Sequence, residues 1–485
     1  MPCLETGIVC KNDTAILAPS YYWKWANATA KESYRRFLDN ILTFNQKYDT
    51  YSKFHGLLPV PLKCPHLASC KGGIDSECQE GYRGTLCASC TTDHYLRFNT
   101  CIKCPKVTIT VLSSAGVMIL FLAVFMMVLW GDSKHTDNDR TVADVIMSCF
   151  KIVLGFHQVI AGIFSALARV RWPITLITMQ KLLKLVEGNI LQFAPFSCIH
   201  PSFRLDPFSE FALAVGVNIV VILLILFYLL ARQSYINKMK ISLNEKVNKI
   251  SSLKKSCYRN IFLFLLLSYP TTSKKILRIL PLPGVCSTMC FTKDRSDCVS
   301  LLKADYSVHC FTARHNVFWR IAASFSLYPM AFPLLVLILL YKYGRSQTHE
   351  EFSFGLRVYF ENYKNTYWFW ETVEMYRKLM LISLILFFES DSLSRIGFSM
   401  ATASAYGIAY TIFRPIKGKF EDRLQAYALW VIFFDVCLGA IYSQPEVNEA
   451  RSENESIFVN VVFVYLNSSV LLLTVGKFRQ ISICR

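Results

Sequence analysis

The chain contains nine apolar runs, and each is close to the length that a helix needs to cross a bilayer. The bilayer core is about 30 Å thick, so a spanning helix needs roughly 20 consecutive apolar residues. The second run carries Lys151, His157 and Gln158, and the fourth is apolar only as far as Tyr269. The runs lie at residues 107–130, 145–170, 211–231, 261–280, 317–341, 368–388, 393–413, 424–442 and 457–475. This pattern predicts an all-helical, multi-pass membrane protein with nine transmembrane helices.

The charge of the chain agrees with this prediction. Hydrophobic residues make up 53% of the 485 residues and charged residues only 18%, which is unusual for a soluble protein. The net charge of +18 could attract nucleic acid. However, the basic residues alternate with the apolar runs and form no single basic domain. Basic loops on the cytoplasmic side of a membrane explain the charge better, so we expect no nucleic-acid partner.

A soluble, cysteine-rich region of residues 1–105 precedes the membrane region of residues 106–485. It contains nine cysteines, and a small segment of this kind is normally held together by disulfides in an oxidising compartment. The alternative is zinc, because Cys87-x-x-Cys90 and Cys101-x-x-Cys104 have the spacing of metal ligands. We expect disulfides and no metal. The cysteines concerned are Cys64, Cys70, Cys78, Cys87, Cys90, Cys101 and Cys104, together with Cys3 and Cys10.

Nine spans with an external amino terminus place the carboxyl terminus in the cytoplasm, and the loops test this topology. The segment 232–260 holds eight Lys or Arg against one acid, and residues 414–423 and 477–485 are also basic; all three fall inside. The acidic loops 389–391 and 444–455 fall outside, as the positive-inside rule requires. Five more cysteines fall in external loops, and we expect these to form disulfides too: Cys198, Cys286, Cys290, Cys298 and Cys310.

Three N-glycosylation sequons agree with this orientation, because they begin at Asn12, Asn27 and Asn454 in external segments. A fourth, at Asn467, lies inside the last span, where it cannot be glycosylated. The first twenty residues contain no secretory signal. Either a tail of about a hundred residues is translocated without one, or the chain begins inside a longer precursor. The expected location is the plasma membrane or another membrane of the secretory pathway.

Two polar segments are suited to the membrane surface. Residues 174–186 place apolar side chains at helical spacing against Lys181 and Lys184, which predicts an amphipathic helix lying on the membrane. The basic segment 232–260 either binds anionic lipid headgroups or only orients the chain.

The stretch from residue 367 to 423 combines apolar runs with charge. In a helix, Glu374 forms an i,i+3 pair with Arg377 and an i,i+4 pair with Lys378, beside several aromatic residues and Glu371. These charges either anchor the helix at the interface or handle an ion or ligand.

Polar residues inside the spans are further candidates, because each must face protein or water. Asp435 lies near the middle of the eighth span, where it either pairs, for example with Lys151, or lines an ion path. Pro270, followed by Thr271, Thr272 and Ser273, predicts a broken helix of the kind that marks permeation sites, unless the span ends there. A polar stripe in the last span suits helix packing or a pore wall; it consists of Asn460, Asn467, Ser468 and Ser469.

Motifs of catalysis are not found. The sequence contains no Walker loop, GxSxG, HExxH or dinucleotide-binding GxGxxG motif. We therefore expect neither an enzyme nor a cofactor.

One family resemblance covers most of the chain from about residue 60. Residues 78–104, including the glycine turn at 81–84, resemble the ephrin-receptor-like (EGF- or laminin-like) cysteine-rich repeats of large membrane proteins in algae, ciliates and oomycetes. Pieces of the membrane region are similar to the same proteins, which are described as TRP-like because they resemble polycystins and the fungal TRP-like flavin-carrier proteins. These pieces are Lys151-Ile152-Val153 with Gln158 and Trp172-Pro173, Tyr269-Pro270 with residues 273–276, residues 304–308 before Cys310, Tyr367-Trp368 with Trp370-Glu371 and Arg377-Lys378, and Arg414-Pro415.

The resemblance implies a gated cation channel or a sensory channel subunit. We also expect the chain to form a homo-oligomer. In this hypothesis the cap and the loop 286–310 sense force or a ligand, the helices of residues 367–442 move, and acidic residues contact the ion. The candidates for the ion path are Asp435, Glu374, Glu371, Asn460, Asn467 and Lys151. The alternatives are a receptor without a pore, which signals through the basic loop, and an anoctamin-like lipid-moving protein.

Overall fold

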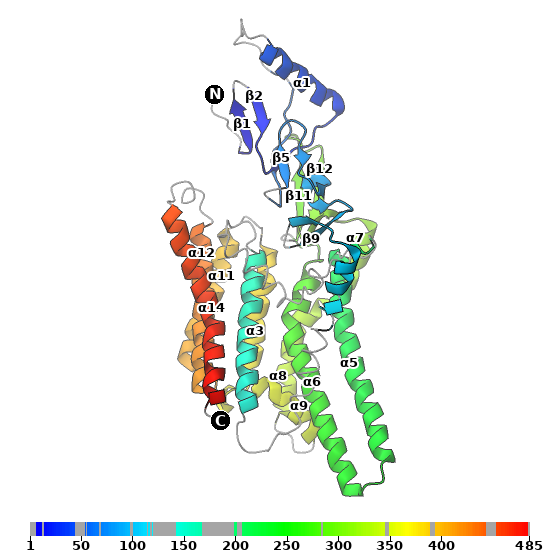
Figure 1. The fold of residues 1–485 in the computed structure, drawn as a ribbon, viewed down its shortest axis with the longest axis vertical. Coiled ribbons are helices and arrows are strands. Elements are labelled where there is room, and N and C mark those ends of the chain that lie inside the picture. Colours follow the sequence, from blue (N-terminus) through cyan, green and yellow to red (C-terminus); the bar gives the residue numbers. More distant parts are fainter. Residues whose placement is uncertain are drawn as a thin grey trace. The chain divides into compact units, whose positions relative to one another are not determined.

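A computed structural model of the chain describes residues 6–11, 14–43, 54, 56–66, 69–97, 100–113, 115–116, 119, 142–166, 198–200, 206–282, 285–344, 349–388, 393–442 and 453–483. The fold is mostly helical, with small β-sheets (Figure 1). The chain divides into two compact units, and neither is continuous in sequence. The first contains Met1–Gly116, Leu191–Pro207 and Pro281–Trp319; the second contains Val117–Ile190, Phe208–Leu280 and Arg320–Arg485.

The described residues of the first unit form short antiparallel strand pairs and include the helix α1 (Ala28–Thr43). Its two-stranded pairs are β1 (Ile8–Lys11) with β2 (Thr14–Leu17), β3 (Tyr21–Tyr22) with β4 (Leu62–Lys63), β5 (Cys70–Gly72) with β6 (Glu77–Cys78), β7 (Tyr82–Arg83) with β8 (Ser89–Cys90), and β9 (His94–Arg97) with β10 (Thr100–Lys103). Residues 286–309 form a three-stranded sheet of β11 (Cys286–Cys290), β12 (Cys298–Leu302) and β13 (Asp305–His309).

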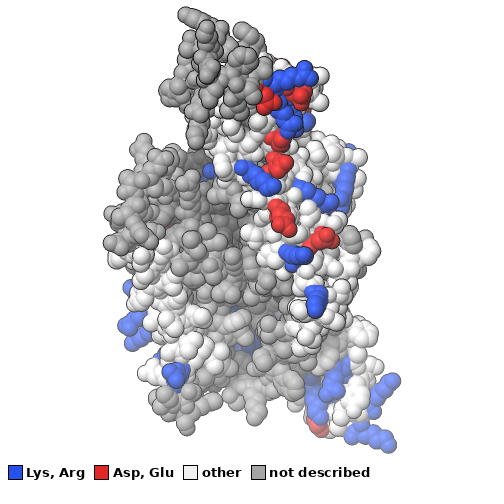
Figure 2. Space-filling view, turned by 45° about the horizontal axis from the view of Figure 1, so that its top comes forward, with Lys and Arg blue, Asp and Glu red and all other residues white. Residues whose placement is uncertain are grey.

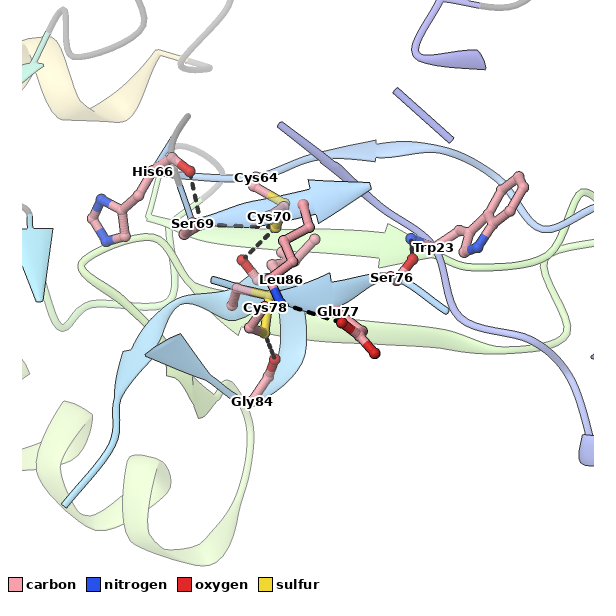
Figure 3. The surroundings of a disulfide bond; sticks show 12 residues. Trp23, Cys64, His66, Ser69, Cys70, Ser76, Glu77, Cys78, Gly84 and Leu86 are labelled. Carbon is pink, nitrogen blue, oxygen red and sulfur yellow. Dashed lines mark hydrogen bonds and ion pairs between the residues drawn. A yellow bond between two sulfur atoms is a disulfide. The ribbon is translucent and has the colours of Figure 1, made fainter. Parts of the chain in front are cut away.

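Cross-links and tight turns hold this unit together, because its strands are too short to bury a large core. Gly72 has φ +79°, and a Cβ there would lie 2.6 Å from the backbone oxygen of Leu17, so only glycine fits. Trp23 is buried, and its indole Nε1 donates to the backbone oxygen of Ile74 at 2.9 Å while its backbone N–H donates to Ser76 Oγ at 2.9 Å. Figure 3 shows this tryptophan, the Cys64–Cys70 disulfide and Leu86, which is fully buried.

The second unit is a bundle of long helices, shown in Figure 1. Its helices in the described residues are α3 (Val142–Ala166), α5 (Pro207–Lys238), α6 (Leu243–Leu277), α8 (Leu327–Tyr343), α9 (Glu350–Phe360), α10 (Trp370–Ile382) with the 3₁₀ turn η6 (Leu384–Phe387), α11 (Leu393–Phe413), α12 (Lys419–Tyr442) and α14 (Glu453–Ile483). The helix α7 (Ala313–Phe325) begins in the first unit and ends in the second. Its largest core lies between α3, α10, α11, α12 and α14 and includes Phe156, Ile160, Tyr410, Ile432 and Phe463.

Six segments in the described part of the chain are long and apolar enough to cross a membrane: Val145–Phe164, Pro207–Lys238, Ala313–Tyr343, Ser394–Phe413, Lys419–Ile441 and Ile457–Gln480. These correspond to six of the nine predicted spans. Most of the first predicted span and the predicted surface helix at 174–186 lie outside the described residues. The remaining two predicted spans fall on α6 and α10. Helix α6 is polar over its amino-terminal half, and helix α10 has only 13 residues, four of which are charged.

The basic segment 232–260 is helical rather than an extended loop. α5 has 32 residues and continues to Lys238, and α6 has 35 residues and begins at Leu243, so only a short turn separates them. At 1.5 Å per residue these helices are about 48 and 52 Å long, which exceeds the bilayer core. Lysine and arginine side chains gather at the α5–α6 turn (Figure 2).

The predicted break at Pro270 is wrong, because α6 continues through Pro270 to Leu277. Proline removes one backbone hydrogen bond, and polar side chains of neighbouring helices can compensate in a membrane protein. Gln158 of α3 donates to the backbone oxygen of Leu267 at 3.1 Å. Asn218 of α5 donates to Thr272 Oγ1 at 2.9 Å and accepts from the hydroxyl of Ser268 at 2.6 Å. These contacts support the helix on both sides of the proline.

Candidate functional site

A buried ion pair lies near the middle of α10. The guanidinium of Arg377 donates from Nε to Glu374 Oε2 at 3.0 Å and from Nη2 to Glu374 Oε1. Both side chains are buried, with 3% and 9% of their surfaces exposed. The helical i,i+3 spacing brings the two together, and a two-point contact between arginine and a carboxylate is among the strong pairings. The predicted Glu374–Arg377 pair is therefore confirmed.

Aromatic residues surround this pair and connect α10 to α11. The Tyr406 hydroxyl donates to Glu374 Oε2 at 2.6 Å, and Trp370 Nε1 donates to the Tyr406 oxygen at 3.0 Å. The Arg377 guanidinium lies 5.0 Å from the centre of the Tyr406 ring, within range of a cation–π contact. Each oxygen of Glu374 thus has a partner, while Arg377 Nη1 has none among the described residues.

Glu371 and Lys378 extend this network towards α3. Glu371 accepts a hydrogen bond from the Tyr363 hydroxyl at 2.9 Å and lies in electrostatic range of Lys151 and Lys378. A Cβ at Gly155 of α3 would lie 2.9 Å from the Lys378 ammonium, so a larger residue there would displace the lysine. The structure therefore brings Glu371, Glu374 and Lys151 together in one network.

The suggested pairing of Lys151 with Asp435 is wrong. The Lys151 ammonium donates to the backbone oxygen of Val358 at 2.5 Å. That oxygen lies in the last turn of α9, where carbonyls lack helical partners and a cation is favourable. Asp435 instead faces α14, so the two charges lie against different helices.

Asp435 and Asn467 form a separate polar pair between α12 and α14. Asn467 Nδ2 donates to Asp435 Oδ1 at 3.2 Å and to the backbone oxygen of Phe463 at 3.0 Å. Both residues are buried, with exposed fractions of 0% and 1%. The second oxygen of the carboxylate, Oδ2, and the amide oxygen of Asn467 have no hydrogen-bond partner in the part of the chain that the structure describes. The pair therefore offers two buried oxygens that lack a donor.

The rest of the polar stripe in α14 is used differently. The hydroxyls of Ser469 and Tyr427 share a hydrogen bond of 2.7 Å, which joins α14 to α12. Asn460 and Ser468 are half-buried.

The polar residues that follow Pro270 lie within α6. Thr271 is half-buried, and Ser273 is fully buried.

All thirteen described cysteines that were predicted to form disulfides do so; Cys10 is one of them, and the other twelve pair with one another. The pairs are Cys64–Cys70, Cys78–Cys87, Cys90–Cys101, Cys104–Cys198, Cys286–Cys310 and Cys290–Cys298. Both sulfurs of each Cys-x-x-Cys motif are cross-linked, so the zinc alternative is wrong. His315 lies close to Cys286 and Cys310, but those two sulfurs are bonded to each other and are not available as thiolate ligands.

The glycosylation candidates fall in different surroundings. Asn27 is exposed at the start of α1, and its Oδ1 accepts from the backbone N–H of Ala30 at 2.7 Å and from the Thr29 hydroxyl at 2.8 Å. It therefore caps the helix. Asn12 and the side chain of Asn454 lie outside the described residues.

Asp75 of the first unit forms two ion pairs, and they lower its pKa. Asp75 contacts Lys31 Nζ at 2.6 Å and Arg35 Nη2 at 2.5 Å, both on α1. The hydrogen bond from Lys31 is the largest cause that holds the pKa of Asp75 below its usual value of 3.8, and Arg35 adds to it.

Two buried side chains outside these networks also join helices, and neither contact was predicted from the sequence. Arg395 is 4% exposed, and its Nη1 donates to the backbone oxygen of Ala166 at 2.6 Å, at the end of α3. Tyr269 donates to the backbone oxygen of Pro329 at 2.6 Å, an oxygen that has no helical donor because residue 333 is proline. Two features of the sequence could have indicated these contacts. Arg395 stands near the start of an apolar run, and Pro333 leaves the carbonyl four residues before it without a helical donor.

In comparisons with family models, curated proteins and solved structures, no match to this chain was found. The function must therefore be inferred from the contacts described above.

Proposed function

We propose that this chain is a gated cation channel or the sensory subunit of one, in which Asp435 contacts the cation. The observation that supports this proposal is the buried carboxylate oxygen of Asp435, which lacks a protein donor within the described residues. A lone carboxylate in an apolar bundle is costly unless it is protonated or paired with a cation. A cation that reached this position would find carboxylate and amide oxygens, which are the ligands that hard cations prefer.

The Glu374–Arg377 network has a different role in this proposal. Its acidic groups already accept hydrogen bonds from Arg377, Tyr406 and Tyr363. A charged network with this many partners holds its helices in one arrangement. We therefore assign Glu374 and Glu371 to the support of α10, and keep Asp435 and Asn467 as the groups that meet the ion.

The proposed orientation places the amino terminus and the disulfide-bonded unit outside and the carboxyl terminus in the cytoplasm. The disulfides favour an oxidising compartment for that unit, and the basic α5–α6 turn (Figure 2) favours the cytoplasm for that end of the hairpin. Assembly as a homo-oligomer belongs to the same proposal.

The test uses the full chain reconstituted in liposomes, with ion flux and headgroup exchange measured in parallel. We expect cation flux for the natural chain and at least a tenfold reduction or a change of ion selectivity for Asp435→Asn. This variant keeps the shape of the side chain. The matched control is Glu245→Gln, which removes one exposed carboxylate at the start of α6 and should leave flux unchanged.

The other outcomes separate the alternatives. Headgroup exchange without cation flux would identify a lipid-moving protein, and the absence of both would favour a receptor without a pore. Normal flux and selectivity in folded Asp435→Asn would remove this residue from the ion path.

A further inference from the structure

The end of the α5–α6 hairpin carries more positive charge than its own acidic side chain balances. This basic tip, residues 232–249, holds five basic residues and one acidic residue. Glu245 pairs with Lys249 at 2.7 Å, so the tip keeps a net positive charge, and basic side chains gather there in Figure 2. All five basic residues except Lys246 are exposed. They are Arg232, Lys238, Lys240, Lys246 and Lys249.

The length of α5 places this tip at the depth of lipid headgroups. The apolar part of the helix, residues 211–231, is about 32 Å long at 1.5 Å per residue, which matches a bilayer core of about 30 Å. The polar end of α5, from Arg232 to Lys238, extends about 10 Å further. The headgroup layer adds about 5–7 Å on each side of the core. The basic tip therefore begins inside this layer and reaches its outer edge.

Contacts between the two helices bring the basic residues of α6 to the same depth. Lys246 Nζ donates to the backbone oxygen of Asn237 at 3.0 Å, so the start of α6 lies beside the end of α5. Asn218, near the other end of α5, contacts Ser268 and Thr272. The helices are thus antiparallel, and both present basic residues at the headgroup layer.

Exposed apolar side chains lie among these charges. Tyr235, Leu243 and Val247 have 56%, 75% and 57% of their surfaces exposed, and the Arg232 guanidinium lies 5.2 Å from the centre of the Tyr235 ring. Basic residues mixed with exposed aromatic and aliphatic residues are typical of segments that bind the membrane interface. A soluble acidic partner would explain the charge but not its depth.

We propose that the basic tip binds the headgroups of anionic lipids in the leaflet beside it and holds the hairpin to that leaflet. The surface of an anionic leaflet attracts basic side chains, and this attraction falls off within a Debye length. In the proposed orientation the leaflet is the cytoplasmic one, which is rich in anionic lipid. The inference rests on that orientation for the source of the lipid, but not on ion conduction.

The experiment measures hydrogen exchange of the full chain in two kinds of nanodisc. One contains phosphatidylcholine alone, and the other contains equal amounts of phosphatidylcholine and phosphatidylserine. A nanodisc exposes both faces of the membrane, so the result is independent of the orientation of the chain in a cell.

Two triple variants, each lacking two lysines and one arginine, are compared with the natural chain. All six positions are exposed. The tip variant is Arg232→Gln/Lys238→Gln/Lys240→Gln. The control is Lys417→Gln/Lys419→Gln/Arg423→Gln, which changes the segment at the start of α12.

We expect the amides of residues 236–245 in the natural chain to exchange more slowly with phosphatidylserine present, by roughly threefold or more. The tip variant should lose this difference, and the control should keep it. Salt at 1 M should remove it from the natural chain, because the Debye length falls to about 3 Å.

Equal exchange of the natural chain in both kinds of nanodisc would overturn the proposal. So would a difference that survives in the tip variant or is lost equally in the control. Slower exchange with soluble poly-glutamate, and none with phosphatidylserine, would identify an acidic protein as the occupant and would also overturn it. The single variants Arg232→Gln and Lys240→Gln are measured in case the triple variant does not fold, and the salt measurement needs no substitution.

Discussion

Tyr406 of α11 donates its hydroxyl hydrogen to Glu374 of α10 at 2.6 Å, and the same tyrosine oxygen accepts from Trp370 Nε1 at 3.0 Å. One hydroxyl therefore serves as donor and acceptor at once inside the bundle. Both functions are needed because a buried carboxylate oxygen and a buried indole N–H are each costly without a partner.

Tyr406→Phe removes this hydroxyl and should lower the free energy of unfolding by about 1–3 kcal/mol. Hydrogen bonds within membrane proteins average only about 0.6 kcal/mol, but this change leaves two buried polar groups with fewer partners. Equilibrium unfolding in detergent micelles checks the value. Tyr465→Phe, at a tyrosine that is 67% exposed on α14, is the control and should change stability by less than about 0.5 kcal/mol. Equal effects of the two variants would show that the Tyr406 contacts add nothing.

The Glu374–Arg377 pair should show strong coupling in a double-mutant cycle. Glu374→Gln or Arg377→Met leaves one buried charge without its partner, so each should cost about 3–5 kcal/mol. The double variant removes both charges and should cost clearly less than the sum of the two. The same unfolding measurement gives all four corners of the cycle. Additive costs would mean that the two side chains act independently.

The local stability of α1 should depend on pH, because Asp75 forms ion pairs with two of its residues. Its pKa in the folded chain lies below 3.8, so the folded state binds fewer protons than the unfolded state near that pH. The contribution is present above about pH 4 and is lost as pH falls through the lowered folded value. Hydrogen exchange of α1 in the full chain, followed from pH 6 down to about pH 3 and corrected for the intrinsic exchange rate, should therefore show falling protection. Asp75→Asn should already have the lower protection at pH 6, and the same protection in both chains would contradict this role.

Cys104 and Cys198 should connect two distant fragments of the chain. Their disulfide closes a loop with a sequence separation of 94, and its removal should cost roughly 4–5 kcal/mol. Cyanogen bromide cuts after methionine and leaves disulfides intact, so the fragments 2–118 and 180–239 should migrate together until reductant is added. Cys198→Ala should separate them without reductant. Cys437→Ala, which changes a free cysteine, should not. Separate fragments in the natural, unreduced chain would rule out this disulfide.

Asn27 should carry an N-glycan when the chain passes through a eukaryotic secretory pathway. Thr29→Ala removes the sequon and retains the hydrogen bond between Asn27 Oδ1 and the Ala30 N–H, so α1 keeps its cap. On a gel, the natural chain should migrate more slowly than this variant. After glycosidase treatment, the two chains should migrate equally. Asn27→Asp also retains a capping oxygen and should behave like Thr29→Ala. No difference between these chains and the natural chain would argue against glycosylation at Asn27.

Local spacing explains which predictions succeeded. Apolar runs of spanning length predicted the six candidate membrane helices found, because helix formation and burial depend on residues close together in sequence. The Glu374–Arg377 contact also followed from spacing within one helix. The density of cysteines in a short, core-poor region, and the even total of fourteen when the five in external loops are added, predicted disulfides, although they could not predict the pairing.

Contacts between distant segments were decided only by the tertiary structure. Asp435 could have met any polar side chain of the bundle, and its position against Asn467 depends on how α12 packs on α14. Near Pro270, α6 accepts hydrogen bonds from Gln158 and Asn218, which lie 109 and 54 residues from the groups that they contact. The sequence by itself thus determined the six candidate membrane helices, the cysteine-rich region and the distribution of charge. Which buried polar groups meet, and which remain without a partner, was decided by helix packing, because those partners are adjacent only in the folded chain.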